Sequence, residues 1–418
     1  MQNVDSVGPL NGVRVVDFTH VIAGPLCTQF LADAGATVIK IEPPQGEWSR
    51  INGALDTDDE SHHVMPFFAA VNRSKESVVL DLRSEAGLSI AKKLIEASDV
   101  LVQNYSPGTL SRLGLDPERL RAEFPRLITV SVSLFGDSPI AQSLGRRGGI
   151  THVAEAQSGL MRNDNEPTAP EPKVRNVADP AAGIAGFGAV CAALYEREKT
   201  KRGRHVEVSM TATAAVFNAC NVTVSQMSTT PNASHYAGMG FYKAADGYVA
   251  LGANSDHLWK RLVEVMGLRE LSTDPRFSTL RERNSRADEA DTALQQWTIE
   301  RTREEIVEVV SPTGVACGSV RTVQEVIADP QSRELSILFD VDDGCGGTIA
   351  SSGNPWGFSQ PRPRLPFCGE STADVLRNFL SLDDRDLEEL AASGAFGGFV
   401  PARAVETLPT DSGNTAAR

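Results

Sequence analysis

Strand and helix signals alternate through the first third of the chain. The predicted strands, which are rich in β-branched residues, occupy residues 13–18, 37–42, 78–82, 100–104 and 127–133. The predicted helices occupy residues 25–34, 85–97 and 117–124. Parallel strands need a long crossover connection, usually a helix, so this order predicts strand–helix–strand units. We therefore expect an α/β fold with a doubly wound parallel sheet, and ligands at the carboxyl ends of its strands.

The pattern changes after a helix that is predicted to begin near Thr211. Residues 225–240 are polar and contain glycine, and a hairpin is predicted around Asp246-Gly247. The later predicted elements are helices at 256–266 and 303–310, a strand at 337–341, a proline-rich stretch at 354–366 and a helix at 371–380. The chain thus leaves the first domain, forms a second one and returns.

A chain of 418 residues is long for one hydrophobic core, so two domains are expected. We predict a large Rossmann-like domain, a smaller α+β domain, a segment returning to the large domain, and a disordered polar tail. These occupy residues 1–224, 225–328, 329–406 and 407–418, respectively.

The charge balance argues against nucleic-acid binding. The chain has 40 basic and 54 acidic residues, a formal net charge of −14, whereas nucleic-acid binding needs clustered positive charge. A local basic pocket for a phosphorylated ligand remains compatible with this composition.

The six cysteines predict neither a zinc site nor a disulfide framework. They are Cys27, Cys191, Cys220, Cys317, Cys345 and Cys368, and none forms a C-x-x-C pair. We therefore expect buried thiols, no metal and a reducing cytoplasmic location, with a catalytic cysteine as the alternative.

The N-terminus lacks a basic start and an apolar core, so no signal peptide is expected. The longest apolar segment, 180–194, is rich in Gly and Ala and is predicted to be too short to span a membrane.

A carboxylate directly before a proline marks the most informative segment. Asp179-Pro180 precedes a long run of small apolar residues that extends to Leu194. Proline fits the first helical position, which would place Asp179 at or next to the N-cap. By itself this pattern indicates a helix cap, and a functional carboxylate is the alternative.

Two glycine patterns bear on cofactor binding. Gly24-Pro25 joins the first predicted strand to its helix, where a phosphate could meet the helix N-terminus. The G-x-G-x-x-G fingerprint is absent, which disfavours a nicotinamide oxidoreductase. The Gly183-x-x-Gly186-x-Gly188 pattern lies inside a predicted helix and indicates close packing.

Several blocks in order along the chain resemble the class III CoA-transferase family (CaiB/BaiF), which includes formyl-CoA transferase and carnitine-CoA transferase. The matching blocks are residues 10–18, 23–25, 31–42, 72–77, 104–108, 174–186, 198–210, 274–277 and 314–318. The resemblance extends from about Leu10 to about Leu390. It implies a small domain inserted into the Rossmann-like domain and an interlocked homodimer.

The resemblance also implies an activity. In the family, the counterpart of Asp179 attacks an acyl-CoA, and CoA passes to a free carboxylic acid through an anhydride and an aspartyl-CoA thioester. The implied CoA-binding residues are Ile22, Ala23, Leu80, Asp81, Leu82, Arg83, Asn104, Tyr105, Ser106 and Arg112. Ala23 would lie along the pantetheine, residues 80–83 near the adenine, and Arg112 at a phosphate. The alternative for both arginines is ordinary surface charge.

Candidate oxyanion donors come from the second domain. Gly238 and Gly240 lie in a glycine-rich segment whose bare backbone could approach a substrate, although the favoured interpretation of the segment is a plain turn. The implied partners are an acyl-CoA, a small carboxylic acid and a second copy of the chain, with no nucleic acid, membrane or metal.

Departures from the family pattern bear on the substrate. Many family members carry a Tyr-Asp pair at positions 150 and 151, and the related α-methylacyl-CoA racemases carry His-Asp there. This chain has Ile150 and Thr151 instead, and His152 lies two residues after Ile150. Glu155 replaces a common glutamine, and Lys201 replaces a glycine. Since Ile150 cannot exchange a proton, CoA transfer is the favoured hypothesis. The alternatives are racemase-like proton transfer on an acyl-CoA and CoA binding without turnover.

Overall fold

The computed structural model describes residues 8–51, 65–136, 139, 141, 143, 151–161, 176–227, 236–357 and 363–401. The chain divides into two compact units. The first consists of residues 1–220 and 333–418, and the second of residues 221–332. The tail predicted at 407–418 lies outside the described residues.

The first unit is built on a parallel sheet of six strands. They are β1 (Arg14–Phe18), β2 (Thr37–Glu42), β3 (Glu76–Val79), β4 (Val100–Gln103), β5 (Ile128–Ser133) and β6 (His205–Ser209). Their order is β3-β2-β1-β4-β5-β6, and every neighbouring pair is parallel. The predicted doubly wound parallel sheet is confirmed. Because β1 pairs with both β2 and β4, the strand order reverses there, which is where such sheets bind ligands.

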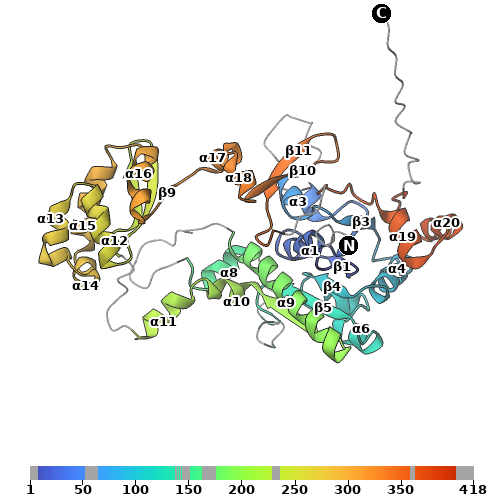
Figure 1. Ribbon diagram of the computed structural model, residues 1–418. Helices are drawn as coiled ribbons and strands as arrows, with labels where there is room; N and C mark the ends of the chain where they lie inside the picture. Colours follow the sequence, from blue (N-terminus) through green and yellow to red (C-terminus); the bar gives the residue numbers. More distant parts are fainter. Residues whose placement is uncertain are drawn as a thin grey trace, which may run out of the picture. The chain divides into compact units, whose positions relative to one another are not determined.

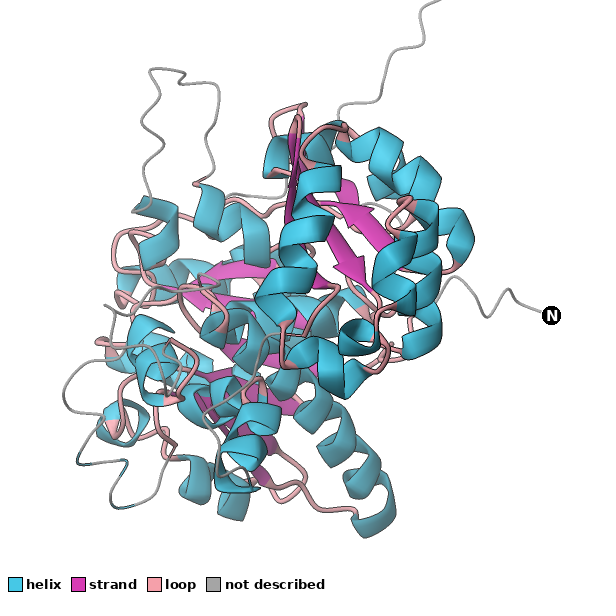
Figure 2. Ribbon diagram, turned by 90° about the vertical axis from the view of Figure 1, so that its left-hand side faces the viewer, coloured by secondary structure: helices cyan, strands magenta, loops and turns pink. Residues whose placement is uncertain are grey.

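Helices cover both faces of this sheet (Figures 1 and 2). The helices of this unit are α1 (Ala23–Asp33), α2 (Trp48–Ile51), α3 (Pro66–Val71), α4 (Glu85–Glu96), α5 (Thr109–Arg112), α6 (Pro117–Glu123), α8 (Thr151–Gln157), α9 (Ala178–Thr200), α10 (Met210–Val216), α19 (Thr372–Leu380) and α20 (Asp384–Ala392). Side chains alternate along each strand, so Val15 joins the core under α1 and α9, whereas Val16 joins the core under α4 and α19. A hairpin of β10 (Leu338–Asp342) and β11 (Thr348–Ser352) completes the unit.

The second unit has its own core around the buried side chains of Trp259 and Phe277. Its antiparallel sheet consists of β7 (Met239–Ala244), β8 (Gly247–Gly252) and β9 (Ala316–Ser319). Its helices are α12 (Asp256–Val265), α13 (Arg269–Thr273), α14 (Leu280–Asn284), α15 (Ala287–Thr298), α16 (Arg303–Val310) and α17 (Val323–Ala328). The hairpin predicted around Asp246-Gly247 is confirmed, since Ala244 pairs with Gly247. At the unit boundaries lie α11 (Ala219–Met227) and α18 (Gln331–Glu334).

Helix α9 packs closely against α1 through two of its three patterned glycines. A Cβ atom added at Gly183 would lie 2.9 Å from Leu26 Cβ and 3.0 Å from the Ala23 carbonyl oxygen. One added at Gly186 would lie 3.0 Å from Cys27 Sγ, whereas one added at Gly188 would meet no atom within 4 Å. The predicted close packing therefore applies to the first two glycines and not to the third.

The same helix is longer than the apolar segment 180–194 from which it was predicted. At 23 residues, α9 has the length and composition to cross a membrane, which corrects the prediction that the segment is too short. Half of its most apolar window is buried inside the protein. Core helices of globular domains share these properties, so length and composition are weak grounds for a membrane span.

The glycine packing gives a stability prediction with a control on the same helix. Gly183→Ala should lower the free energy of unfolding by about 1–3 kcal/mol, because its Cβ would overlap the α1 backbone. Gly188→Ala should raise it by about 0.5–1 kcal/mol, because alanine favours helix and the position is open. Urea denaturation followed by circular dichroism measures both. Equal effects of the two substitutions would contradict this packing.

Candidate active site

A cavity of about 530 Å³ opens at the carboxyl ends of the strands around the switch point. Its volume is in the range of small-molecule sites. Its lining comes from the end of β5, from the loops that follow β1, β4 and β5, and from the starts of helices α1, α2, α3, α8, α9 and α10. The lining residues are His20, Val21, Ile22, Ala23, Trp48, Phe67, Asn104, Tyr105, Ser106, Pro107, Val132, Ser133, Leu134, Phe135, Gly136, Ala141, Thr151, His152, Asn176, Asp179 and Met210. The cavity lies where the sheet topology predicts a ligand.

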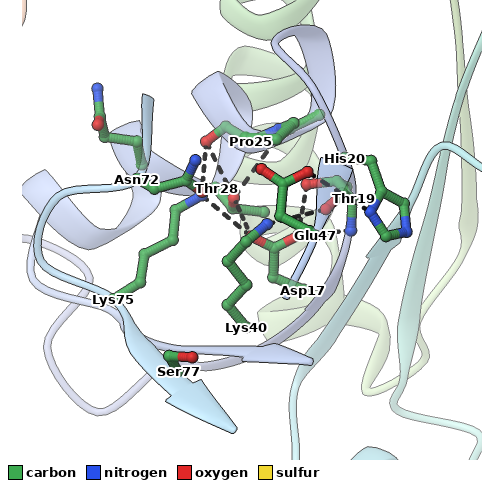
Figure 3. A network of polar contacts seen from close by, with 12 residues as sticks. Asp17, Thr19, His20, Pro25, Thr28, Lys40, Glu47, Asn72, Lys75 and Ser77 are labelled. Carbon is green, nitrogen blue, oxygen red and sulfur yellow. Dashed lines mark hydrogen bonds and ion pairs between the residues drawn. The ribbon is translucent and has the colours of Figure 1, made fainter. Parts of the chain in front are cut away.

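A buried network of polar groups supports the loop between β1 and α1 (Figure 3). Asp17 on β1 accepts hydrogen bonds from the Thr19 N–H and hydroxyl, at 2.8 and 2.5 Å. Its other oxygen accepts from the Thr28 hydroxyl on α1 at 2.6 Å and from Lys75 at 3.1 Å. Burial alone would raise the pKa of Asp17, but Lys75, Lys40 and the hydroxyl donors outweigh it and lower the pKa to about 2. The carboxylate stays ionised and ties β1 to α1.

Two buried lysines bind the start of this loop and the first turn of α1 that follows it (Figure 3). Lys40 Nζ donates to the Thr19 carbonyl oxygen at 2.9 Å. Lys75 Nζ donates to the Pro25 carbonyl oxygen at 2.9 Å and to Asn72 Oδ1 at 2.8 Å. These bonds bring side chains from β2 and from the segment before β3 to the loop that lines the cavity.

The tip of this loop is fixed by the neighbouring loop after β4. The Asn104 side chain accepts from the His20 N–H and donates to the His20 carbonyl oxygen, both at 2.8 Å. The His20 ring packs against Tyr105 with ring centroids 5.0 Å apart. Val21 has a φ of 70°, which is strained for a β-branched residue, and its N–H points to Glu47 at 3.4 Å. The surrounding contacts thus hold a backbone conformation that the loop alone would avoid.

Helix α9 begins one residue before Asp179, with Val177 at the N-cap. Pro180 is therefore the third helical residue, and the prediction that it occupies the first position is wrong. Proline is tolerated there because the first N–H groups of a helix have no partner within the helix. The cap comes from Glu155 on α8, whose Oε1 accepts from the N–H groups of Val177 and Ala178 at 2.6 and 3.3 Å.

The Asp179 carboxylate is half-buried and faces the cavity. Burial, followed by the charge of Glu155, raises the pKa of Asp179 to about 6, while His152 acts in the opposite direction. Among the residues that the structure describes, no hydrogen bond or ion pair engages this carboxylate. A half-buried carboxylate that has a raised pKa and faces a cavity is a candidate nucleophile or proton acceptor.

The structure brings together six of the residues implied by the resemblance. The cavity is lined by Ile22, Ala23, Asn104, Tyr105, Ser106 and Asp179. The remaining CoA-binding predictions lie outside this cavity. The Leu80 side chain is fully buried in a core, and Leu82 packs against it. Arg83 is exposed and pairs with Asp81 at 3.0 Å, and Arg112 donates to the Thr109 hydroxyl at 2.8 Å.

The two candidate oxyanion glycines belong to the second unit. The Gly238 N–H donates to Asp291 Oδ1 at 2.9 Å, and its φ of 76° is that of a turn. Gly240 lies in β7 opposite Leu251 of β8. In this structure the Gly238 N–H is thus already engaged, and the role of both glycines stays a prediction.

Sequence reasoning did not identify several cavity residues as site residues. They include His20, Trp48, Phe67, Asn176 and Met210, which are distant from one another in the sequence. Three of these positions carried a signal: His20 follows a predicted strand, and Asn176 and Met210 lie in the blocks 174–186 and 198–210 that resemble the family. Ile150 lies outside the described residues, whereas Thr151 and His152 line the cavity. Within the described part of the chain, no group of His, Cys, Asp or Glu could hold a metal ion.

Comparisons with known proteins agree with this fold and site. The chain matches CoA-transferase family III over residues 10–372. An acetyl-CoA:oxalate CoA-transferase of Acetobacter aceti is 33% identical, and the match covers 89% of this chain and 96% of the relative. A succinyl-CoA–D-citramalate CoA-transferase of Chloroflexus aurantiacus is 30% identical, with coverage of 92% and 97%. The crystal structure of a CAIB/BAIF family protein from Brucella suis is 28% identical with a TM-score of 0.75, and covers 89% of this chain and 100% of that one.

A parallel sheet with a cavity at its switch point and a basic carboxylate at a helix start defines an α/β enzyme. The chain belongs to CoA-transferase family III, which confirms the resemblance drawn from the sequence blocks. It is therefore an enzyme of the class III CoA-transferase type, and proteins of this family use CoA thioesters as substrates.

The raised pKa of Asp179 predicts that this residue destabilises the folded protein. On folding, the pKa of this carboxyl group rises from 3.8 to about 6. Its ionisation therefore lowers the free energy of unfolding progressively as the pH rises from about 4 to 6, and the full loss is present above pH 6. Asp179→Asn should therefore raise the free energy of unfolding at pH 8 by about 1–3 kcal/mol. The gain should shrink as the pH falls from 6 toward 4. Urea denaturation at several pH values measures it, and a less stable variant at pH 8 would contradict the analysis.

Proposed function

We propose that this enzyme moves CoA from an acyl-CoA to a free carboxylic acid, with Asp179 as the covalent nucleophile. The observation that carries the proposal is the half-buried Asp179 carboxylate, which lines the cavity at the switch point and has no partner in the described part of the chain. A raised pKa makes this carboxylate more basic, and thus a better nucleophile, than an exposed one. Family membership supplies the class of reaction.

The first half-reaction loads CoA onto the enzyme. A carboxylate oxygen of Asp179 attacks the carbonyl carbon of the acyl-CoA thioester, the carbon–sulfur bond breaks, and CoA leaves as a thiolate. The product is a mixed anhydride between the acyl group and Asp179. The thiolate then attacks the side-chain carbonyl carbon of Asp179, which releases the donor acid as a carboxylate. Asp179 now carries CoA as a thioester.

The second half-reaction transfers CoA to the acceptor. An oxygen of the acceptor carboxylate attacks the side-chain carbonyl carbon of Asp179, and CoA thiolate leaves again. The thiolate then attacks the acceptor's carbonyl carbon in the new anhydride, which frees the new acyl-CoA and restores the carboxylate. No proton is gained or lost overall, so the steps need N–H donors for the oxyanions rather than a general acid. We propose no metal for this chemistry.

The proposed CoA contacts fall into two groups, according to whether the residues line the cavity. Ile22, Ala23 and residues 104–106 line the same cavity as Asp179, which supports contacts with the reactive end of the pantetheine. For the adenine and the phosphates, the proposal rests on the resemblance at residues 80–83 and Arg112. Arg83 would exchange its present partner, the Asp81 carboxylate, for a phosphate.

The acyl-CoA donor and the acceptor acid are to be identified by a direct assay. The names of the two relatives above specify oxalate and D-citramalate as acceptors, so small dicarboxylic acids are the first to test. Incubation with acetyl-CoA, formyl-CoA or succinyl-CoA and a panel of free acids, followed by mass spectrometry of new CoA esters, identifies the pair. Absence of any new ester across a broad panel would contradict CoA transfer by this chain.

Proton transfer at the α-carbon of an acyl-CoA is the second candidate. The observation that favours it is the position of His152, which lines the cavity together with Asp179. Incubation of a 2-methylacyl-CoA with the enzyme in deuterated water would reveal deuterium at the α-carbon. Deuterium uptake without CoA transfer would select this function over the first.

We also propose an interlocked homodimer in the cytoplasm. Helix α11 has no buried residue and exposes Val222, Val224 and Met227, which supports a partner surface. The six cysteines are free, which suits a reducing compartment.

Loss of the nucleophile should abolish transfer. Asp179→Asn keeps the size of the side chain but cannot form the anhydride, so the rate of CoA transfer should fall at least about a thousandfold. Circular dichroism checks that the fold is retained, and hydroxylamine added during turnover should label residue 179 in the wild type only. Near-normal transfer by the variant, with no deamidation back to Asp in its mass spectrum, would refute the covalent mechanism.

The proposed homodimer predicts the molecular mass of the protein in solution. Light scattering at micromolar concentration should report twice the chain mass of 44.8 kDa. Met227→Lys on the exposed face of α11 should weaken the assembly or leave part of the protein as monomer, whereas a surface control such as Arg385→Lys should not. A wild-type monomer would refute the proposed assembly.

A further inference from the structure

Helix α9 is capped by a residue from another helix rather than from its own start. Its N-cap residue, Val177, has no side-chain oxygen to offer. Glu155 on α8 accepts from the N–H groups of Val177 and Ala178 with one carboxylate oxygen, Oε1. Glu155 is only 2% exposed, and its other oxygen, Oε2, has no hydrogen-bond partner among the described residues. A buried carboxylate with one unpaired oxygen is costly, so the arrangement calls for an explanation.

The cap has two consequences for the next residue, Asp179. It fixes the backbone immediately before Asp179 and thereby the direction in which the helix presents that side chain to the cavity. It also places a second negative charge beside the Asp179 carboxylate, and this charge raises the pKa of Asp179. The side chain at 155 therefore acts on both the position and the basicity of Asp179.

Few other charged groups face Asp179 from the elements that pack against α9. From α8, His152 opposes the effect of Glu155. Helix α1 carries a single charged side chain, Asp33, at its far end, where it pairs with Arg73. Helix α10 and strand β5 carry none, as their sequences consist of apolar, Ser and Thr residues.

The remaining candidates lie on β6. This strand carries His205, whose Nδ1 lies 2.9 Å from the Thr129 hydroxyl, and the exposed Glu207. Neither contributes to the pKa shift of Asp179, in which burial, Glu155 and His152 are the causes. Glu155 is therefore the one acidic side chain among the described residues that raises the basicity of Asp179.

We propose that Glu155 is a positioning residue for the reaction, because it anchors the start of α9 and its buried charge strengthens Asp179 as a nucleophile. The proposal rests on the proposed function of Asp179. The unpaired Oε2 fits this role, since a carboxylate with both oxygens neutralised by donors would exert less charge on its neighbour.

Glu155→Gln separates the charge from the anchor. Glutamine keeps an oxygen for the N–H groups of Val177 and Ala178 but removes the negative charge. The control is Glu198→Gln, which removes the same charge from the other end of α9, about 28 Å away at 1.5 Å per residue. The measurement is the pH dependence of kcat/KM for CoA transfer from pH 4.5 to 9.

The wild-type activity should rise with pH to a plateau as Asp179 ionises. In Glu155→Gln the midpoint of this rise should move down by about one pH unit, so activity at pH 5 relative to the plateau should increase about fivefold. The plateau itself should fall, because the carboxylate is less basic. Glu198→Gln should leave the midpoint in place. A midpoint in Glu155→Gln equal to that of the wild type overturns the proposal.

A failure of the proposed function has a different signature. If Asp179→Asn transfers CoA at close to the wild-type rate, the nucleophile is wrong, whatever Glu155→Gln does. If Asp179→Asn is inactive and the midpoint in Glu155→Gln does not move, only the inference about Glu155 fails.

A second measurement applies if Glu155→Gln folds poorly. In wild-type protein with ¹³C-labelled carboxyl groups, the Glu155 resonance should respond at the pH where Asp179 ionises, because the two charges interact. That response should vanish in Asp179→Asn. A Glu155 resonance that shows the same titration in both proteins overturns the proposal.

Discussion

The ion pair between Asp17 and Lys75 is the interaction on which the site depends. Both side chains are fully buried, and removal of one partner from such a pair typically costs about 3–5 kcal/mol, because the other charge is left in an apolar interior. Around this pair, hydroxyl and carbonyl groups join β1, α1 and the segment before β3 (Figure 3). The pair therefore holds the loop at the switch point in the shape that one wall of the cavity requires.

The other wall depends on how α9 begins. The close approach of α9 to α1, allowed by Gly183 and Gly186, brings the helix start to the same edge of the sheet. There Asp179 has no hydrogen-bond or ion-pair partner among the described residues, and Glu155 lies beside it, which costs stability and raises the pKa of Asp179 together. The strained backbone of Val21, on the loop that forms the first wall, is a second unfavourable feature. Both features are unfavourable locally and are held by the structure around them.

Much of the scaffold follows from local sequence patterns. The strands at Thr37–Glu42 and Ile128–Ser133 and the helices at Glu85–Glu96 and Arg303–Val310 lie at or within one residue of their predicted bounds, because periodicity, turns and caps are local signals. Short elements such as α3, α8 and β9 have no strong periodicity and were not predicted. The start of α9 was misplaced because its cap, Glu155, is 22 residues away from the Val177 N–H that it binds.

The sequence by itself determined the parallel α/β class, the family and the identity of Asp179 as the candidate nucleophile, because these depend on residue order along contiguous segments. The tertiary structure decided the rest. It placed His20, Asn104 and His152 around one cavity with Asp179, although they come from separate loops and helices. It also decided the basicity of that carboxylate, because burial and the charge of Glu155 arise only when α8 packs against α9.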